Sequence, residues 1–333
     1  MDLNKIISKA RPNVKESTIK MYERNLNKLK KLFEADDWDF LDDPKKIHEM
    51  LKDKHYSTIR NYYNSIIILL MALNSDKKKD KLIEEYSDLR DELNKQYEDE
   101  NAKGIISDKQ KGNFVPLKEV EDMIETIGKE ISTKKIKKKE DLTQKDKALL
   151  QVYVLLNIHI RLPMRNDMAG IEAIMKSRYN KLTDKEKEEN NYLVVQKSNM
   201  WFVLNQYKTQ KKYKEKKIDI PKDLEKILRL FIRINGMGML FKSSTGKPLS
   251  RNALTQLLTK TSKKYMDKSI STTMLRKIVL SEKFQDVKEE MEDMAHITGH
   301  SVDTMSKVYV KKGQDKSSKK EKDKDKTDKS NKD

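Results

Sequence analysis

The spacing of hydrophobic residues predicts four helices within the first hundred positions. Hydrophobic side chains recur at helical intervals from Ile19 to Leu32, with Ser17 as the expected helix cap. A second helix is expected to begin at Asp43-Pro44, because aspartate caps helices and proline suits their first position. The third, Thr58–Leu73, is apolar enough to be central, and a fourth spans about 81–98. These segments predict a small helical bundle.

After residue 103 the helical spacing of hydrophobic residues is interrupted, and further on the pattern changes to one that predicts strands. Residues 104–116 show no periodicity and contain two glycines, which predicts a linker. Helical spacing resumes at Leu117, and a strongly apolar helix is expected over Lys145–Ile160. Short runs of β-branched and aromatic residues then predict three strands, at Tyr192–Val195, Trp201–Leu204 and Lys216–Ile220. Further helices are expected at 224–232, 251–265, 273–284 and 287–297.

The predicted elements correspond to a fold class that is mainly α with a small antiparallel β-sheet. We expect a helical domain at 1–103, the linker at 104–116 and a second domain at 117–313. Residues 314–333 are rich in lysine and aspartate and contain no hydrophobic side chain, so we expect a disordered tail there.

The charge of the chain points to an anionic partner. Lysine and arginine number 72 against 54 acidic residues, and the net charge of +18 attracts nucleic acid first and an anionic membrane second. No predicted helix combines a basic face with a large aromatic face, which argues against the membrane. Apolar runs such as Ile66–Leu73 are too short to span a bilayer, and residues 1–14 lack a signal-peptide core. We expect an intracellular, soluble protein that is found with DNA.

Composition also excludes several kinds of chemistry. The chain has no cysteine, which removes disulfides, thiolate zinc sites and cysteine nucleophiles. Its five histidines are not accompanied by a carboxylate cluster, so neither a metal site nor a cofactor is predicted. Because lysine far outnumbers arginine, an arginine near a motif is a strong candidate for a forked phosphate contact.

The second domain carries functional residue types in a distinctive order. Gly299-His300-Ser301 precedes Tyr309, which lies nine residues after the histidine. Upstream, the run Thr273-Met274-Leu275-Arg276 ends in an arginine, and Arg165 follows the apolar helix. Lys208 stands in the run Tyr-Lys-Thr after the second predicted strand.

In residue type and order these motifs resemble those of the tyrosine recombinases and phage integrases. The resemblance covers roughly residues 15–312 and includes the pattern at 57–62 in the helical bundle. It implies an N-terminal four-helix, SAM-like core-binding domain. It also implies a C-terminal mixed α/β catalytic domain of the DNA breaking-rejoining type.

The resemblance implies covalent chemistry on DNA. Tyr309 would attack the scissile phosphate, forming a 3′-phosphotyrosyl link and freeing a 5′-hydroxyl without a metal or cofactor. Arg165 and Arg276 would hold the non-bridging oxygens, and His300 would donate a further hydrogen bond. Lys208 would protonate the leaving oxygen as general acid. The activity would be site-specific DNA recombination or integration.

Two positions depart from the family's pattern. Thr273 stands where the family usually has histidine, and a hydroxyl binds phosphate but transfers protons poorly near neutral pH. We therefore expect slower chemistry. The family often has an acidic residue three positions after the first arginine, where this chain has Met168, with Asp167 one place early.

The resemblance implies double-stranded DNA as the partner, clamped between the two domains, and a homotetramer acting on two duplexes. Arg60 and Asn61, near the start of the third helix, are candidate DNA contacts. The alternative is that this apolar helix forms the bundle core, with only its first turn exposed. High lysine and low arginine usage is typical of an AT-rich genome, such as that of a virus or mobile element.

Other interpretations stay open. A type IB topoisomerase uses a similar residue set but relaxes supercoils as a monomer, and an inactive descendant would keep DNA binding alone. Taken alone, Tyr309 is an ordinary surface tyrosine. Arg161 is a rival to Arg165. Several lysines crowd the same hairpin as Lys208: Lys211, Lys212, Lys214, Lys216 and Lys217.

Overall fold

The computed structural model describes residues 2–310 except 74–76, 103, 105 and 140, so the tail predicted at 314–333 lies outside the described residues. The chain forms two compact units that divide between Ser107 and Asp108. That division falls inside the segment expected as a linker, 104–116. Helix α6 (Asp108–Lys111) already belongs to the second unit.

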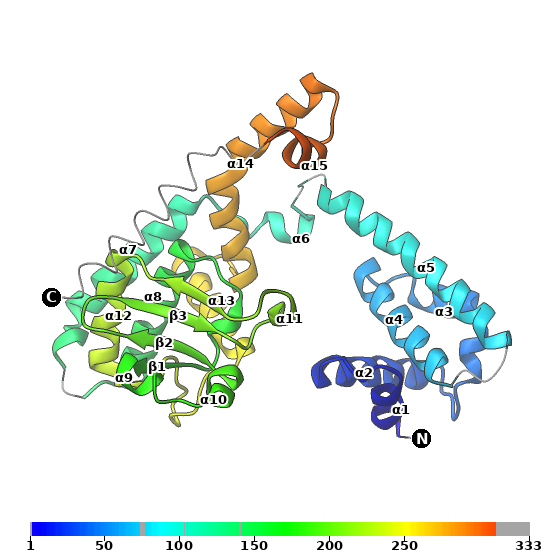
Figure 1. The fold of residues 1–333 in the computed structure, drawn as a ribbon, viewed down its shortest axis with the longest axis horizontal. Coiled ribbons are helices and arrows are strands. Elements are labelled where there is room, and N and C mark those ends of the chain that lie inside the picture. Colours follow the sequence, from blue (N-terminus) through cyan, green and yellow to red (C-terminus); the bar gives the residue numbers. More distant parts are fainter. Residues whose placement is uncertain (1, 74–76, 103, 105, 140, 311–333) are drawn as a thin grey trace. The chain divides into compact units, whose positions relative to one another are not determined.

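The described part of the first unit is helical (Figure 1). Its helices are α1 (Leu3–Ala10), α2 (Glu16–Leu32), α3 (Pro44–Leu51), α4 (Tyr56–Leu73) and α5 (Lys77–Ala102). The four helices expected from the hydrophobic pattern correspond to α2–α5. Asp43 caps α3 as expected, because its carboxylate accepts a hydrogen bond from the Lys46 backbone N–H at 3.0 Å. The expected cap at Ser17 is wrong, since α2 begins at Glu16 after Lys15.

Helix α4 forms the centre of this unit. Its residues Tyr63, Ile66 and Leu69 are completely buried, and α1, α2 and α5 pack around it. Tyr86 of α5 is buried beside them, and its hydroxyl donates a hydrogen bond to the Leu41 carbonyl at 2.8 Å. That bond ties the long helix α5 to the segment between α2 and α3.

The second unit contains a five-stranded sheet in the order β4-β3-β2-β1-β5. The strands are β1 (Ile171–Met175), β2 (Asn191–Val195), β3 (Met200–Leu204), β4 (Lys216–Asp219) and β5 (Gly238–Met239). The three predicted strands correspond to β2, β3 and β4, which pair antiparallel as expected. The sequence did not predict β1 and β5. Because β1 runs parallel to β2, the sheet is mixed rather than wholly antiparallel.

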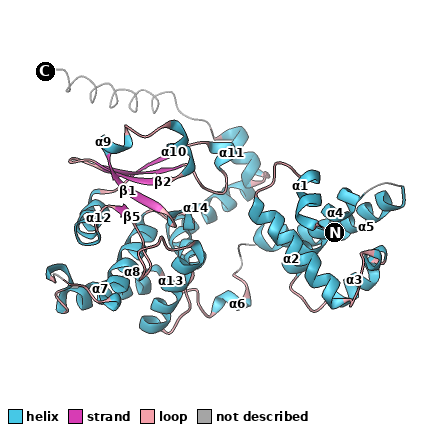
Figure 2. Cartoon of the chain, turned by 90° about the horizontal axis from the view of Figure 1, so that it is seen from below, coloured by secondary structure: helices cyan, strands magenta, loops and turns pink. Residues whose placement is uncertain are grey.

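Side chains alternate between the two faces of this sheet, and both faces are covered (Figure 2). On one face Tyr192, Val194 and Trp201 pack with Tyr179 at the end of α9 (Lys176–Tyr179), close to α10 (Asp184–Glu189). The opposite face joins the main core. The helices of that core are α7 (Leu117–Thr133), α8 (Gln144–Arg161), α12 (Lys222–Asn235), α13 (Arg251–Met266) and the first turns of α14 (Thr272–Thr298).

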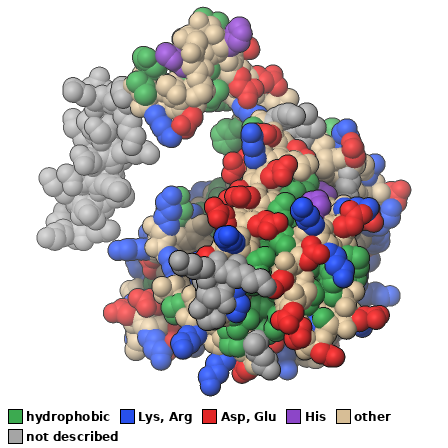
Figure 3. Space-filling model, turned by 90° about the vertical axis from the view of Figure 1, so that its right-hand side faces the viewer, with side chains coloured by type: hydrophobic (Ala, Val, Ile, Leu, Met, Phe, Trp, Pro, Cys, Tyr) green, Lys and Arg blue, Asp and Glu red, His purple; other side chains and the backbone are tan. Residues whose placement is uncertain are grey.

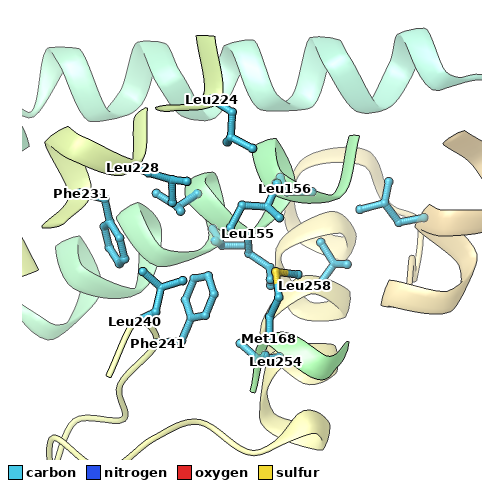
Figure 4. Packing of buried hydrophobic residues seen from close by; sticks show 14 of the residues in the cluster. Leu155, Leu156, Met168, Leu224, Leu228, Phe231, Leu240, Phe241, Leu254 and Leu258 are labelled. Carbon is cyan, nitrogen blue, oxygen red and sulfur yellow. The ribbon is translucent and has the colours of Figure 1, made fainter. Parts of the chain in front are cut away.

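Helix α8 runs through the middle of the main core. Thr143 and Asp146 form a reciprocal capping box at its start, each side chain bonding the other's backbone N–H. Leu155 and Leu156 are completely buried between side chains of α12 and α13 (Figure 4). Because most side chains of α8 are buried, packing fixes the position of its C-terminal end and of the segment that follows.

Helix α14 (Thr272–Thr298) is a single helix where we expected two, at 273–284 and 287–297. The intervening Gln285-Asp286 is polar but contains neither glycine nor proline, so it does not end a helix. Figure 1 shows α14 running away from the sheet towards α15 (Val302–Thr304). The last described turn is a π-helical turn, Met305–Tyr309.

Removing the Tyr86 hydroxyl should destabilise the first unit. Tyr86→Phe leaves the buried Leu41 carbonyl without its donor, which costs about 1–3 kcal/mol in free energy of unfolding. Urea denaturation of the full chain measures the loss. Tyr97→Phe, at an exposed tyrosine of the same helix, is the control and should change stability by less than about 0.5 kcal/mol. Equal effects of both substitutions would contradict the assignment.

Candidate active site

Two arginines reach the candidate site from different elements. Arg165 is the N-cap of the short 3₁₀ turn Asn166–Met168, which follows α8 after a few residues. Met168 is completely buried, so the core anchors the turn while the Arg165 side chain stays exposed. Arg276 lies in the second turn of α14, next to the completely buried Leu275.

The two guanidinium groups act on each other electrostatically. Burial lowers the pKa of Arg276 below its usual range, the charge of Arg165 lowers it further, and Asp167 acts in the opposite direction. Two neighbouring cations repel each other unless an anion binds between them, and half-burial of Arg276 weakens the screening by water. The pair is therefore suited to holding a phosphate through guanidinium forks.

Asp167 anchors the turn that carries Arg165. The Asp167 side chain is buried, and its carboxylate accepts a hydrogen bond from Arg251 Nη2 at 3.0 Å. Asn166 donates to the Arg251 carbonyl at 3.0 Å and to Thr255 Oγ1 at 2.7 Å. Asp167, which stands one position before the place where the family often has its acidic residue, is thus paired with Arg251. Its charge also acts on Arg276.

Asn191 joins this turn to the segment that precedes Lys208. Asn191 begins β2 and is buried, and its Nδ2 donates to the carbonyls of Asp167 and Gln206, both at 3.0 Å. Its Oδ1 accepts from the backbone N–H groups of Asn205 at 2.8 Å and Gln206 at 2.7 Å. The sequence did not single out Asn191, because one asparagine at the start of a strand forms no recognisable motif.

Lys208 is exposed in the connection between β3 and β4, just before α11 (Gln210–Tyr213). Tyr207 is buried next to it and donates its hydroxyl hydrogen bond to the Lys214 carbonyl at 2.6 Å. Burial raises the pKa of Tyr207, and Tyr213 and then Asp167 raise it further electrostatically. Because Asn191 bonds both Asp167 and Gln206, the connection is tied to the turn that carries Arg165.

The rival cations have other contacts. Arg161 ion-pairs with Asp223 and donates to Asn157 Oδ1 at 2.9 Å. In the hairpin, three of the rival lysines place their ammonium groups over aromatic rings, at 5.2 to 5.3 Å from the ring centres for Lys212 and Lys216 and 4.9 Å for Lys217. These contacts favour Arg165 and Lys208 for a role towards a substrate.

Thr273 lies in the first turn of α14, three residues before Arg276 and therefore on the same side of the helix. Ser271 caps this turn, its hydroxyl accepting the Met274 N–H at 3.1 Å. Thr272 is buried, whereas Thr273 is exposed. The first two turns of α14 therefore present a hydroxyl and a guanidinium side by side.

His300 and Tyr309 form a pair at the other end of α14. Gly299 ends the helix with a φ of +68°, a left-handed conformation that glycine adopts without strain. The His300 imidazole and the Tyr309 phenol stack with ring centres 4.8 Å apart and planes at 21°. Both residues are exposed, and Tyr309 keeps 59% of its surface accessible.

This pair is distant from the arginines within one chain. Arg276 and Thr298 belong to one continuous helix, and the 22 residue steps between them correspond to about 33 Å. The predicted residues therefore form two groups. Arg165, Thr273, Arg276 and Lys208 belong to segments next to the main core, whereas His300 and Tyr309 follow the far end of α14.

In the first unit, Arg60 has intramolecular partners. Its guanidinium lies 4.7 Å from the centre of the Tyr97 ring and donates to Asn94 Oδ1 at 3.3 Å, so α5 covers it. The Asn61 carbonyl accepts hydrogen bonds from Asn25 and Ser65. An exposed basic face lies on α2 instead, and the sequence analysis missed it although its residues recur at helical spacing. The face consists of Lys20, Arg24, Lys28 and Lys31, which border a shallow groove.

His159 is a second residue that the sequence analysis did not assign to the site. It is completely buried near the end of α8, and one ring nitrogen, Nδ1, bonds the Leu155 carbonyl at 2.9 Å. Burial lowers its pKa to about 4, and the charge of Arg276 contributes in the same direction. Within the described residues its Nε2 has no hydrogen-bond partner. A neutral His159 therefore lies behind the arginine site.

Two absences hold for the part of the chain that the structure describes. No group of three or more histidine and acidic side chains is placed to hold a metal ion. No helix has both the length and the hydrophobicity needed to cross a bilayer.

Acid should destabilise the second unit through His159. Its folded pKa of about 4 lies below the ordinary value of 6.5, so only the unfolded chain takes up this proton between those pH values. The free energy of unfolding is therefore highest above pH 6.5 and decreases as the pH falls from 6.5 towards 4. Between pH 7 and pH 5 the loss should be about 2 kcal/mol more in wild type than in His159→Leu, measured by urea denaturation. The exposed His296→Leu should retain the wild-type slope, and equal slopes for all three proteins would refute the assignment.

Comparison with known proteins finds similarity only among solved structures. No protein-family model and no curated protein matches the chain. The chain is similar to the Tn1549 transposon integrase, solved in complex with transposon right end DNA, at 17% identity and a TM-score of 0.47. The similarity covers 96% of this chain and 98% of that one. XerA recombinase is similar at 12% identity and a TM-score of 0.33, over 94% and 95% of the two chains. Because both TM-scores lie below 0.5, a function for this chain has to rest on its own residues.

Proposed function

We propose that this chain is a tyrosine recombinase, which cuts and rejoins DNA at specific sites through a covalent link to Tyr309. The observation that carries the proposal is that Met168, in the turn after Arg165, and Leu275, beside Arg276, are buried in the same core, so that arginines from distant parts of the sequence act on each other electrostatically. Lys208, His300 and Tyr309 stand in separate motifs that follow the family order together with these arginines along the sequence. A phosphate is the group that two such arginines would bind.

The proposed reaction uses each of these side chains. The Tyr309 hydroxyl loses its proton to water as its oxygen attacks the phosphorus of the scissile phosphate, and the bond from phosphorus to the 5′-oxygen breaks. The leaving 5′-oxygen takes a proton from Lys208. Arg165 and Arg276 hold the non-bridging oxygens as negative charge develops, and His300 donates a further hydrogen bond. The phosphodiester energy is kept in the phosphotyrosyl link, so attack by a 5′-hydroxyl reverses the step without a cofactor.

Double-stranded DNA is the proposed partner. A net charge of +18 supports binding to the phosphate backbone, and the basic face of α2 supplies exposed cations in the first unit. The two units would clamp the duplex, and a tetramer on two duplexes would carry out recombination. Integration or excision of a mobile element is the proposed biological outcome.

A direct test is covalent trapping on nicked duplex DNA without magnesium. Wild type should form a protein–DNA adduct that survives denaturation, because a nick lets the cut fragment diffuse away before rejoining. Tyr309→Phe should form none. Tyr97→Phe, which removes an exposed hydroxyl from α5, is the matched control and should retain the adduct. An adduct that persists in Tyr309→Phe would contradict the assignment of the nucleophile.

The separation of Tyr309 from the arginines favours one alternative, a descendant that binds DNA without cutting it. That protein would show DNA binding that weakens with salt but no adduct from any DNA of its genomic surroundings. The same trapping experiment therefore distinguishes the two functions.

Thr273 should limit the rate of cleavage. Thr273→His introduces an imidazole beside Arg276, where it can transfer a proton during the reaction, and we expect a gain of about tenfold or more. Single-turnover cleavage of the nicked substrate measures the rate. Thr273→Asn, which adds a polar group of similar size without proton-transfer capacity, should bring no such gain. A His variant no faster than the Asn variant would count against the role given to this position.

A further inference from the structure

Helix α13 contacts both of the elements that carry the candidate arginines. It packs against the 3₁₀ turn that follows Arg165 and against α14, which contains Arg276. Leu254 and Leu258 of α13 are completely buried in the main core, which holds the helix in place. Thr255 follows Leu254 and is half-buried. A side chain at this position of α13 can therefore reach both arginine-bearing elements.

The Thr255 hydroxyl makes a contact on each side. Asn166, the residue after Arg165, donates from Nδ2 to Thr255 Oγ1 at 2.7 Å. Thr272 Oγ1, in the first turn of α14, lies 3.3 Å from the same oxygen. The Arg251 carbonyl, one turn earlier in α13, accepts the hydrogen of the Thr255 hydroxyl at 3.2 Å. The hydroxyl thus lies at the meeting point of three elements.

One hydroxyl group satisfies all three contacts. A hydroxyl donates one hydrogen bond and accepts two. Thr255 donates its hydrogen to the Arg251 carbonyl, so its two lone pairs accept from Asn166 and Thr272. The same Arg251 carbonyl accepts from Asn166 Nδ2 at 3.0 Å, which fixes the orientation of the Asn166 amide. The donors and acceptors of this network are therefore matched.

The network joins each arginine through a short stretch of chain. Asn166 adjoins Arg165, and Thr272 lies four residues before Arg276, one turn away on the same side of α14. Hydrogen bonds depend on direction as well as distance, so they fix the relative position of two elements more closely than non-directional hydrophobic contacts do. The Thr255 hydroxyl therefore limits how far the two arginines can move apart.

The separation of the arginines matters because cations are common on this protein. Figure 3 shows lysine and arginine side chains interspersed with acidic ones over the visible face. A single cation therefore does not distinguish a phosphate site from the rest of the surface. Two guanidinium groups at a fixed separation do so, because their forks bind different oxygens of one phosphate.

We propose that Thr255 is a positioning residue of the candidate active site, whose hydroxyl links the Arg165 turn to α14 and fixes the separation of Arg165 and Arg276. It acts through the arginines and not on the reacting phosphate. A displacement of about 1 Å in such a site costs up to about a hundredfold in rate. This inference rests on the proposed recombinase function, and it adds a residue that lies outside the sequence motifs.

Three substitutions in the full-length protein test the role of the hydroxyl. Thr255→Val removes the hydroxyl and keeps the shape of the side chain, whereas Thr255→Ser keeps the hydroxyl. A change in packing alone would affect the serine variant, which lacks a methyl group, at least as much as the valine variant. Thr261→Val is the matched control on α13, because the Thr261 hydroxyl bonds the Leu257 carbonyl of the same helix at 2.8 Å.

Single-turnover adduct formation on nicked duplex DNA, with protein at saturation, measures the rate. Thr255→Val should lower this rate about tenfold or more and keep DNA affinity within about twofold of wild type, because most phosphate contacts along the duplex are unchanged. Thr255→Ser and Thr261→Val should keep the rate within about threefold of wild type. Equal rates for Thr255→Val and Thr255→Ser would overturn the inference while the proposed function stands.

Binding of inorganic phosphate gives a readout that does not depend on cleavage. The Nε–H magnetic resonance signals of Arg165 and Arg276, assigned through Arg165→Lys and Arg276→Lys, should shift in wild type as phosphate is added. Thr255→Val should raise the phosphate dissociation constant about fivefold or more relative to Thr255→Ser. If wild type forms no adduct, the proposed function fails and this titration decides the inference. Equal phosphate affinities of the two variants, or no shift in wild type, would then overturn it.

Discussion

The burial of α8 is the constraint on which the candidate site depends. Its capping box sets where the helix starts, and the core around Leu155 and Leu156 leaves one path for the chain that follows. That path leads directly to Arg165, and Met168 anchors it a few residues later. Arg276 stands opposite because Leu275 beside it enters the same core. Hydrophobic packing thus brings together two like charges that would otherwise separate.

Buried polar groups adjust the charge around the arginines and connect the segments that hydrophobic packing positions. Asp167 offsets part of the positive charge on Arg276, and Asn191 links the Arg165 turn to the segment before Lys208 through four hydrogen bonds. His159 stays neutral behind the arginines because burial opposes its protonation. The result is a pre-arranged pair of arginines rather than a loose group of surface cations, and such pre-arrangement is the condition for stabilising charge during phosphoryl transfer.

Sequence patterns predicted elements whose signals are local and missed those that depend on pairing. The β-branched and aromatic runs of β2, β3 and β4 are clear, whereas Ile171–Met175 contains residues equally common in helices and becomes β1 by pairing with β2. Motif order identified Arg165, Lys208, Arg276, His300 and Tyr309, because their residue types and spacing are unusual together. Motif order could not show that α14 is one continuous helix, because the polar pair Gln285-Asp286 resembles a helix end. That continuous helix separates His300 and Tyr309 from the other site residues. His159 was missed because an isolated polar residue in apolar surroundings looks like an ordinary core position. Asn191 was missed because it ends a run of polar residues and forms no recognisable motif.

The central claim is that Tyr309 becomes covalently linked to DNA. Mass spectrometry of the trapped complex, after digestion with trypsin and nuclease, tests it most directly. The account predicts that the peptide 308–311 carries a nucleotide remnant on Tyr309 and that no other peptide does. A remnant on a different residue would contradict the account, as would wild-type protein that binds the same DNA and carries no remnant at all.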